Sequence, residues 1–398
     1  MTIAIECYIA ACTLLLLFEI CFLFLKNAKI QQLKPDHEAF EEELSREIRL
    51  YQETGAFSDD FIQTAGRKLS QTKNMITLQN MLEKMPKATN WFRPLLLEQL
   101  SAYEKKKDEE QAFYTYMISL LDYHEEKVPA DFASRFIGFL DSKSLYTFTN
   151  TMAALYAFGE SSLLLQAMEK INARSGFYHK KLLVDGLLRY QGDFDELNQA
   201  LVKQFYRYAP HTQECLLDYF RLQEYNVSDL CLSLMQDAQA DVEVQHRALR
   251  YFHKFRHAEA KQVMLELLKK EETSWIKQML AIQGLKGYDD AETVHEIRRK
   301  LFSRNWHVRI NAVEYFYQKG MDQKELQDIL ELRDKYTNEA LLYQFRNDPE
   351  TAAYIMERIR TFEEEEVRID ALQNQQKSLP AIQQWAEEGG ERYAACSV

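Results

Sequence analysis

Apolar residues recur along the chain at helical spacing and, between Ser144 and Leu332, at a fixed step of 32 residues. Six segments align when the sequence is stepped by this distance. One column of the alignment reads Tyr156, Leu188, Phe220, Phe252, Gly284 and Phe316. The column before it reads Leu155, Leu187, Tyr219, Tyr251, Gln283 and Tyr315, and four residues before the first column stand Met152, Val184, Leu216, Ala248, Leu280 and Ala312. Because residues four apart lie on one face of a helix, these columns predict a buried helical stripe that is used six times.

Self-similarity at this period is typical of a solenoid, in which each repeat buries its apolar face against its neighbours. We therefore expect an all-α fold of antiparallel helix pairs, with Phe220, Phe252 and Phe316 buried between successive repeats. Gly284 interrupts the bulky column, and we expect Leu285 to fill the space. Other glycines follow the first helix of a repeat, where helices commonly end with a residue in the left-handed conformation. They are Gly159, Gly192, Gly287 and Gly320.

The same patterns divide the whole chain into five parts. Residues 3–25 are apolar, and residues 26–57 contain a charged amphipathic helix, expected to be a stalk, with Phe40, Leu44, Ile48 and Tyr51 on one side. Residues 58–143 hold further helical pairs that do not fit the 32-residue step and are expected to form a cap. The repeat array covers 144–332, and 333–398 is expected to be a C-terminal helical cap with a polar tail.

The apolar segment Ile3–Leu25 is long enough to cross a bilayer, because 23 residues at about 1.5 Å each span roughly 30 Å. No Lys or Arg precedes it, whereas Lys26, Lys29 and Lys34 follow it directly. Under the positive-inside rule the C-terminal side is then cytoplasmic. The sequence therefore predicts a single-pass protein of the cell membrane whose C-terminal domain lies in the cytoplasm.

Glu19 is an acidic residue within this apolar segment. An acid in a membrane helix is costly and indicates a partner or a function by default. The alternative is that Glu19 lies close enough to the Lys26 end to reach the membrane surface, or is protonated. Both interpretations stay open at this point.

Three segments carry a resemblance to a known family. They are Asp241-Val242-Glu243-Val244-Gln245-His246-Arg247-Ala248, Thr273-Ser274-Trp275-Ile276-Lys277-Gln278-Met279-Leu280 and Asn305-Trp306-His307-Val308-Arg309-Ile310-Asn311-Ala312. The pattern of a capping polar residue, then Val-Arg, then a small residue resembles the short bacterial HEAT repeat. Only Val308-Arg309 keeps the Val-Arg pair, and the period is shorter than the about 40–47 residues of long HEAT repeats. The resemblance covers about half the chain and implies a protein that binds other proteins.

The formal net charge of −12 disfavours a sequence-independent nucleic-acid binder, which needs a basic stripe. The six cysteines contain no C-x-x-C pair, and the chain contains no phosphate-binding, dinucleotide-binding or nucleophile motif. His246, His253 and His257 form the only histidine cluster, and we interpret them as surface residues because no further metal ligands accompany them. We therefore expect no catalytic residue, no metal and no cofactor.

Basic residues on the second helices are candidate partner-binding groups, although solvated helix faces are the simpler explanation of such charges. These basic residues are Lys261, Lys269, Arg298, Arg299 and Arg333, and Glu19 is a further candidate partner-binding residue. The predicted function is a membrane-anchored scaffold, not an enzyme, that holds a partner protein, itself expected to be membrane-associated. By analogy the partner is a membrane enzyme such as an envelope-polysaccharide glycosyltransferase. The alternative is an enzyme in which helical repeats hold a ligand or prosthetic group, and a deep apolar groove with converging polar side chains would favour it.

Overall fold

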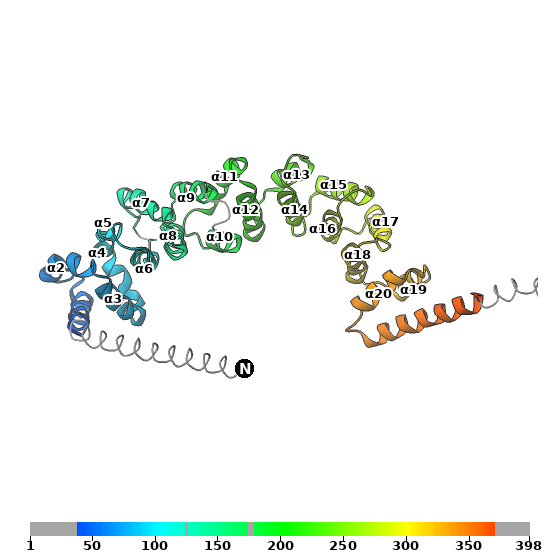
Figure 1. The fold of residues 1–398 in the computed structure, drawn as a ribbon, viewed down its shortest axis with the longest axis horizontal. Coiled ribbons are helices and arrows are strands. Elements are labelled where there is room, and N and C mark those ends of the chain that lie inside the picture. The colour runs from blue at the N-terminus through cyan, green and yellow to red at the C-terminus, as the bar shows by residue number, and fades with distance from the viewer. Residues whose placement is uncertain (1–37, 124–125, 174–178, 371–398) are drawn as a thin grey trace, which may run out of the picture. The chain divides into compact units, whose positions relative to one another are not determined.

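The computed structural model describes residues 38–123, 126–173 and 179–370. All the regular elements in these ranges are helices and none is a strand, which confirms the all-α prediction for this part of the chain. The chain divides into two compact units, Met1–Tyr219 and Phe220–Val398, which we call the N-terminal and C-terminal units (Figure 1). Each is described separately below.

The N-terminal unit begins with a helix over 38–54, followed by a series of shorter helices. These are α2 (Asp59–Leu69), α3 (Thr72–Lys84), η1 (Pro86–Phe92), α4 (Arg93–Leu97), α5 (Leu100–Tyr103), α6 (Asp108–Ser119), α7 (Ala130–Phe136), η2 (Ile137–Asp141), α8 (Leu145–Phe158), α9 (Ser161–Ala173), α10 (Lys180–Leu187), α11 (Phe194–Gln204) and η3 (Phe205–Arg207). The boundary between the two units falls inside the next helix, α12 (Pro210–Gln223).

The C-terminal unit continues the alternation of first and second helices. Its helices are α13 (Ser228–Gln236), α14 (Val242–Tyr251), α15 (Ala258–Lys269), α16 (Trp275–Leu285), α17 (Ala291–Lys300), α18 (Trp306–Gln318), α19 (Gln323–Leu330) and α20 (Lys335–Gln344). A last helix occupies 349–370. The six aligned segments thus begin at α8, α10, α12, α14, α16 and α18.

The helices stack in two layers within each unit. In the C-terminal unit the first helices α14, α16, α18 and α20 contact one another in succession, and the second helices α13, α15 and α17 do the same (Figure 1). In the N-terminal unit α6, α8 and α10 form the corresponding series. This arrangement is consistent with an α-solenoid. The stacking extends to α6, which precedes the segment where the 32-residue step was visible.

The aligned columns form the core between repeats, as predicted. Phe220, Phe252 and Phe316 are all buried, as are the residues four positions earlier in each repeat. The first helices α14, α16 and α18 each begin with a side-chain cap that accepts a backbone N–H bond, and the residues that the HEAT-like pattern singled out, Asp241 and Asn305, serve in this role. Local capping and the buried stripe therefore agree on where each helix begins.

The amphipathic helix expected after the apolar segment is present at 38–54, but it is not a free stalk. Phe40, Leu44 and Ile48 are buried against the N-terminal unit. Glu47 accepts hydrogen bonds from the Ser58 N–H and hydroxyl, at 2.9 and 2.8 Å, and so ties this helix to the start of α2. No helix among the described residues is long and apolar enough to cross a membrane. The predicted membrane segment 3–25, with Glu19, lies outside the described residues.

Two different structural features explain why glycine occupies the inter-helix turns. Gly159 and Gly320 have φ of +67° and +79°, so the predicted left-handed conformation is confirmed for them. The prediction is wrong for Gly192 and Gly287, whose φ is not positive. A Cβ on Gly192 would lie 2.1 Å from the carbonyl oxygen of Gly159, because two successive turns meet there, and one on Gly287 would lie 2.8 Å from Nε of Arg256.

Gly284, the one glycine of the aromatic column, is packed closely by a neighbouring helix. Leu285, expected to fill the space at this position, is buried. A Cβ on Gly284 would lie 2.4 Å from Sδ of Met264, so the side chain of Met264, from α15 of the preceding repeat, occupies that space. Methionine suits an irregular gap because it is unbranched and flexible.

Tyrosines of the core also join successive repeats through their hydroxyl groups. Tyr251 donates to the carbonyl oxygen of Tyr225 at 3.1 Å, and Tyr315 donates to that of Tyr288 at 2.7 Å. Each acceptor lies in the turn of the preceding repeat, where backbone groups would otherwise be unpaired. Burial raises the pKa of Tyr315 to about 12. The abundance of tyrosine thus reflects both packing and the satisfaction of turn carbonyls.

Candidate partner-binding surface

The basic residues predicted to contact a partner form ion pairs within the chain. Lys261 on α15 pairs with Asp290, the cap of α17, with 2.8 Å between Nζ and Oδ2. Hydrogen bonds from Lys261 and Thr293 lower the pKa of Asp290 to about 2. Lys269 reaches Glu292 of α17 at 3.0 Å. Both pairs therefore connect one second helix to the next.

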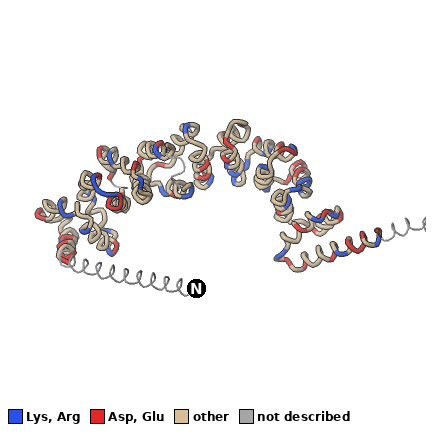
Figure 2. Tube along the Cα trace, in the orientation of Figure 1, with Lys and Arg blue, Asp and Glu red and all other residues tan. Residues whose placement is uncertain are grey.

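The three arginines predicted to contact a partner also form ion pairs within the chain. Arg298 on α17 pairs with Glu325 on α19 at 2.7 Å, and Arg299 pairs with Glu296 on its own helix at 3.1 Å. Arg333 follows α19 and pairs with Glu365 of the last helix at 2.6 Å. Figure 2 shows basic and acidic segments interleaved along the C-terminal unit. The five side chains thus have structural partners, and the structure does not assemble them into a separate basic patch.

The three clustered histidines also have structural contacts. Nε2 of His253 lies 3.0 Å from the carbonyl oxygen of Leu280, in the next repeat. Nδ1 of His257 accepts from the backbone N–H of Ala260 and caps α15. The interpretation as a surface residue is wrong for His246, which is buried beside Glu243, and its burial lowers the pKa of the imidazole. No group of three potential metal ligands occurs in the described part of the chain.

A different set of side chains is exposed at the same place in successive repeats of the C-terminal unit. We call it the exposed row, and it consists of Val242, Trp275, Trp306 and Tyr336. They stand at the first or second position of α14, α16, α18 and α20, and their exposed fractions are 56%, 42%, 38% and 57%. These helices contact one another in order, so the exposed row has one member on each of four successive first helices (Figure 1). Single exposed apolar residues are ordinary on protein surfaces, whereas these four recur at the start of successive first helices.

The aromatic groups of the exposed row are held by neighbouring repeats. The ring of Trp275 stacks on His307 with 5.0 Å between centroids, and Trp306 meets the edge of Tyr343 at 6.0 Å. The guanidinium of Arg309 lies 5.1 Å from the ring of Tyr336. Arg309 is itself buried, and it donates to the carbonyl oxygens of Leu301, at 3.2 Å, and of Ser303. The rings are therefore fixed before any partner arrives, which lowers the entropy that binding would cost.

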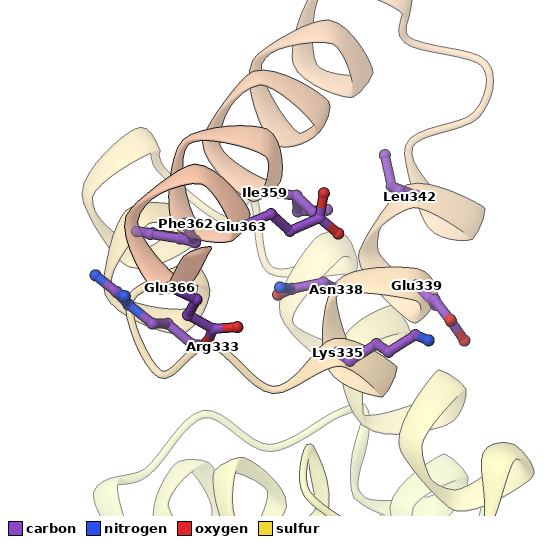
Figure 3. Close-up of a pocket in the computed structure, with 9 residues that line it drawn as sticks. All are labelled: Arg333, Lys335, Asn338, Glu339, Leu342, Ile359, Phe362, Glu363 and Glu366. Atoms are coloured by element: carbon purple, nitrogen blue, oxygen red, sulfur yellow. The ribbon is translucent and has the colours of Figure 1, made fainter. Parts of the chain in front are cut away.

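A pocket of about 280 Å³ opens beside the exposed row, between α20 and the helix over 349–370 (Figure 3). Leu342, Ile359 and Phe362 supply apolar walls, and five charged side chains complete the lining with Asn338. The side chain of Asn338 points from α20 toward the facing helix. Arg333, one of the predicted partner-binding residues, lines this pocket, but it is engaged by Glu365 and lies 4.5 Å from the ring of Phe362.

Sequence reasoning missed the exposed row because it followed the buried columns. The signal was nevertheless present in the sequence: a capping residue is followed directly by tryptophan in Ser274-Trp275 and Asn305-Trp306. A large aromatic residue directly after a cap, outside the buried stripe and repeated in register, predicts an exposed ladder. The pocket carried no comparable signal, since its walls come from α20 and the last helix, outside the repeat array.

Comparisons with known proteins do not assign the chain to a family. No protein-family model matches it, and no curated protein matches it.

Proposed function

We propose that the protein is a scaffold that binds a partner protein along the exposed row of its C-terminal unit. The observation that carries the proposal is the repeated exposure of Val242, Trp275, Trp306 and Tyr336 at the starts of successive first helices. Tryptophan, tyrosine and arginine are the residues most enriched at energetic centres of protein interfaces. A ladder of rigid aromatic groups on successive first helices suits a partner that runs across several repeats.

The sequence supports two further parts of the proposal. The repeats are HEAT-like, on the resemblance of the three segments that begin at Asp241, Thr273 and Asn305. Residues 3–25 form a single membrane-spanning anchor that places the C-terminal domain in the cytoplasm. A scaffold of this kind holds its partner, here taken to be another membrane-associated protein such as a membrane glycosyltransferase, at the membrane surface.

The runner-up, a helical-repeat enzyme that holds a prosthetic group, needs a deep apolar groove with converging polar groups. Three pockets of the described residues measure about 280, 310 and 330 Å³ and are lined by mixed polar and apolar side chains. The exposed row therefore supports the scaffold better than these pockets support the enzyme.

Membrane topology can be tested with a reporter fused after Val398 that is active only outside the cytoplasm. We expect it to be silent, because Lys26, Lys29 and Lys34 follow the apolar segment directly and none precedes it. The same reporter fused to a protein of known opposite orientation serves as the positive control. A strong signal from the fusion at Val398 would reverse the proposed orientation.

Partner binding at the exposed row can be tested by photo-crosslinking in intact cells. A photoreactive phenylalanine analogue in place of Tyr336 should form an adduct with one discrete protein, because this position lies on the exposed row. The control is the same analogue at His295, whose side chain is 70% exposed on the second helix α17. We expect no discrete adduct there. Equal adducts from both positions would contradict a partner confined to the exposed row.

A further inference from the structure

The pocket beside the exposed row contains a polar group without a partner. Asn338 is only 6% exposed, and its Oδ1 has no hydrogen-bond donor among the described residues. A buried carbonyl oxygen left unpaired is unfavourable, so the site gains from any ligand that brings an N–H donor. Figure 3 shows the Asn338 side chain reaching toward the helix over 349–370, with Glu363 and Glu366 on either side of it.

The charges of the lining favour a cation. Glu339, Glu363 and Glu366 line the pocket together with Arg333 and Lys335. Arg333 is already paired with Glu365, which does not line the pocket, and the ammonium of Lys335 extends away from Asn338 (Figure 3). Within the described ranges no basic group lies at ion-pair distance from Glu363 or Glu366. The inner part of the pocket is therefore acidic.

The walls favour a cation carried on an apolar stem. Leu342, Ile359 and Phe362 supply the apolar part of the lining. Lysine and arginine side chains have this character, since their methylene groups pack on apolar surface while the charged head meets polar groups. A small inorganic cation would leave these walls without contact.

We propose that this pocket takes the side chain of an arginine or lysine of the partner protein. The inference rests on the proposed function, because the partner would reach the pocket from the exposed row. Tyr336 of the row and Lys335 of the pocket are adjacent on α20, and Asn338 follows within one turn. The guanidinium or ammonium group donates to Oδ1 of Asn338 and lies between the carboxylates of Glu363 and Glu366. The partner is thus a protein with a basic residue next to an apolar contact segment.

The first test uses a small probe on the full-length protein. N-acetyl-arginine amide is titrated while the side-chain amide signal of Asn338, identified by its loss in N338D, is followed by nuclear magnetic resonance. N-acetyl-citrulline amide is the matched control, because it has nearly the same shape without the charge. We expect citrulline to bind about tenfold more weakly, as charge-assisted hydrogen bonds are about twice as strong as neutral ones. In the E363Q/E366Q variant the two probes should bind equally. Equal binding of both probes to the wild-type protein would overturn the inference.

The second test separates this inference from the proposed function. The partner segment that crosslinks at position 336 is sequenced, and its nearest Arg or Lys is changed to Gln. The loss of partner affinity, about tenfold, should occur with the wild-type protein and vanish with E363Q/E366Q, as expected when two groups act on each other. The pocket assignment is wrong, and the scaffold proposal stands, if the adduct at 336 persists but the partner's change to Gln costs the same affinity with the wild-type protein and with E363Q/E366Q. If no adduct forms at 336, the scaffold proposal and the pocket assignment fall together.

Discussion

Replacing Phe252 with alanine should destabilise the C-terminal unit by about 3–5 kcal/mol, the usual cost of removing a fully buried aromatic ring. Phe252 is 2% exposed, and its ring lies 5.4 Å from that of Tyr251 and 5.9 Å from that of His257. The truncation leaves a cavity where α14 meets its neighbours. Because repeats bury their faces only against one another, the loss at one repeat weakens both adjoining interfaces.

The effect is measured as faster amide hydrogen exchange in α14 and α15 of the full-length protein, since a repeat array need not unfold in a single step. Phe302→Ala is the matched control, because the same ring is removed from a side chain that is 41% exposed in the turn after α17. That change should cost well under 1 kcal/mol, as surface substitutions usually do. If F252A and F302A have the same small effect, Phe252 is not a core residue and the 32-residue register is wrong.

The buried part of the fold could be predicted because it depends on periodicity. The apolar columns and the caps at Asp241 and Asn305 are set by local sequence, so they were visible without the structure. The turn glycines were harder, since a left-handed glycine and one that only allows close approach look the same in a sequence. Gly192 and Gly287 belong to the second class, and the groups that approach them, from Gly159 and Arg256, lie one repeat away.

The candidate site was less predictable for a related physical reason. Charges such as Lys261 and Arg298 look available in a sequence, but their carboxylate partners lie about one repeat later, at Asp290 and Glu325. Such pairing depends on the rotation between neighbouring repeats, which no single repeat specifies. The pocket at Asn338 depends on how the last helix packs on α20, where the repeat pattern has ended.

Simultaneous replacement of Trp275 and Trp306 with alanine should nearly abolish partner binding while the fold is kept. Exposed aromatic residues at interface centres contribute about 2 kcal/mol or more each, which corresponds to roughly thirtyfold in affinity. Both rings are exposed at the first position of a helix, so their loss leaves the buried columns intact. The two effects need not add, because both rings would contact the same partner.

The most direct measurement is recovery of the partner with the full-length W275A/W306A protein from solubilised membranes, compared with wild type and with F302A. Phe302 matches the tryptophans in exposure but lies outside the exposed row, so it controls for loss of apolar surface alone. Unchanged hydrogen exchange in α14 to α18 shows that the variant remains folded. The account predicts wild-type recovery with F302A and almost none with W275A/W306A. Wild-type recovery with a folded W275A/W306A protein would contradict it, because the exposed row would then not be the surface that holds the partner.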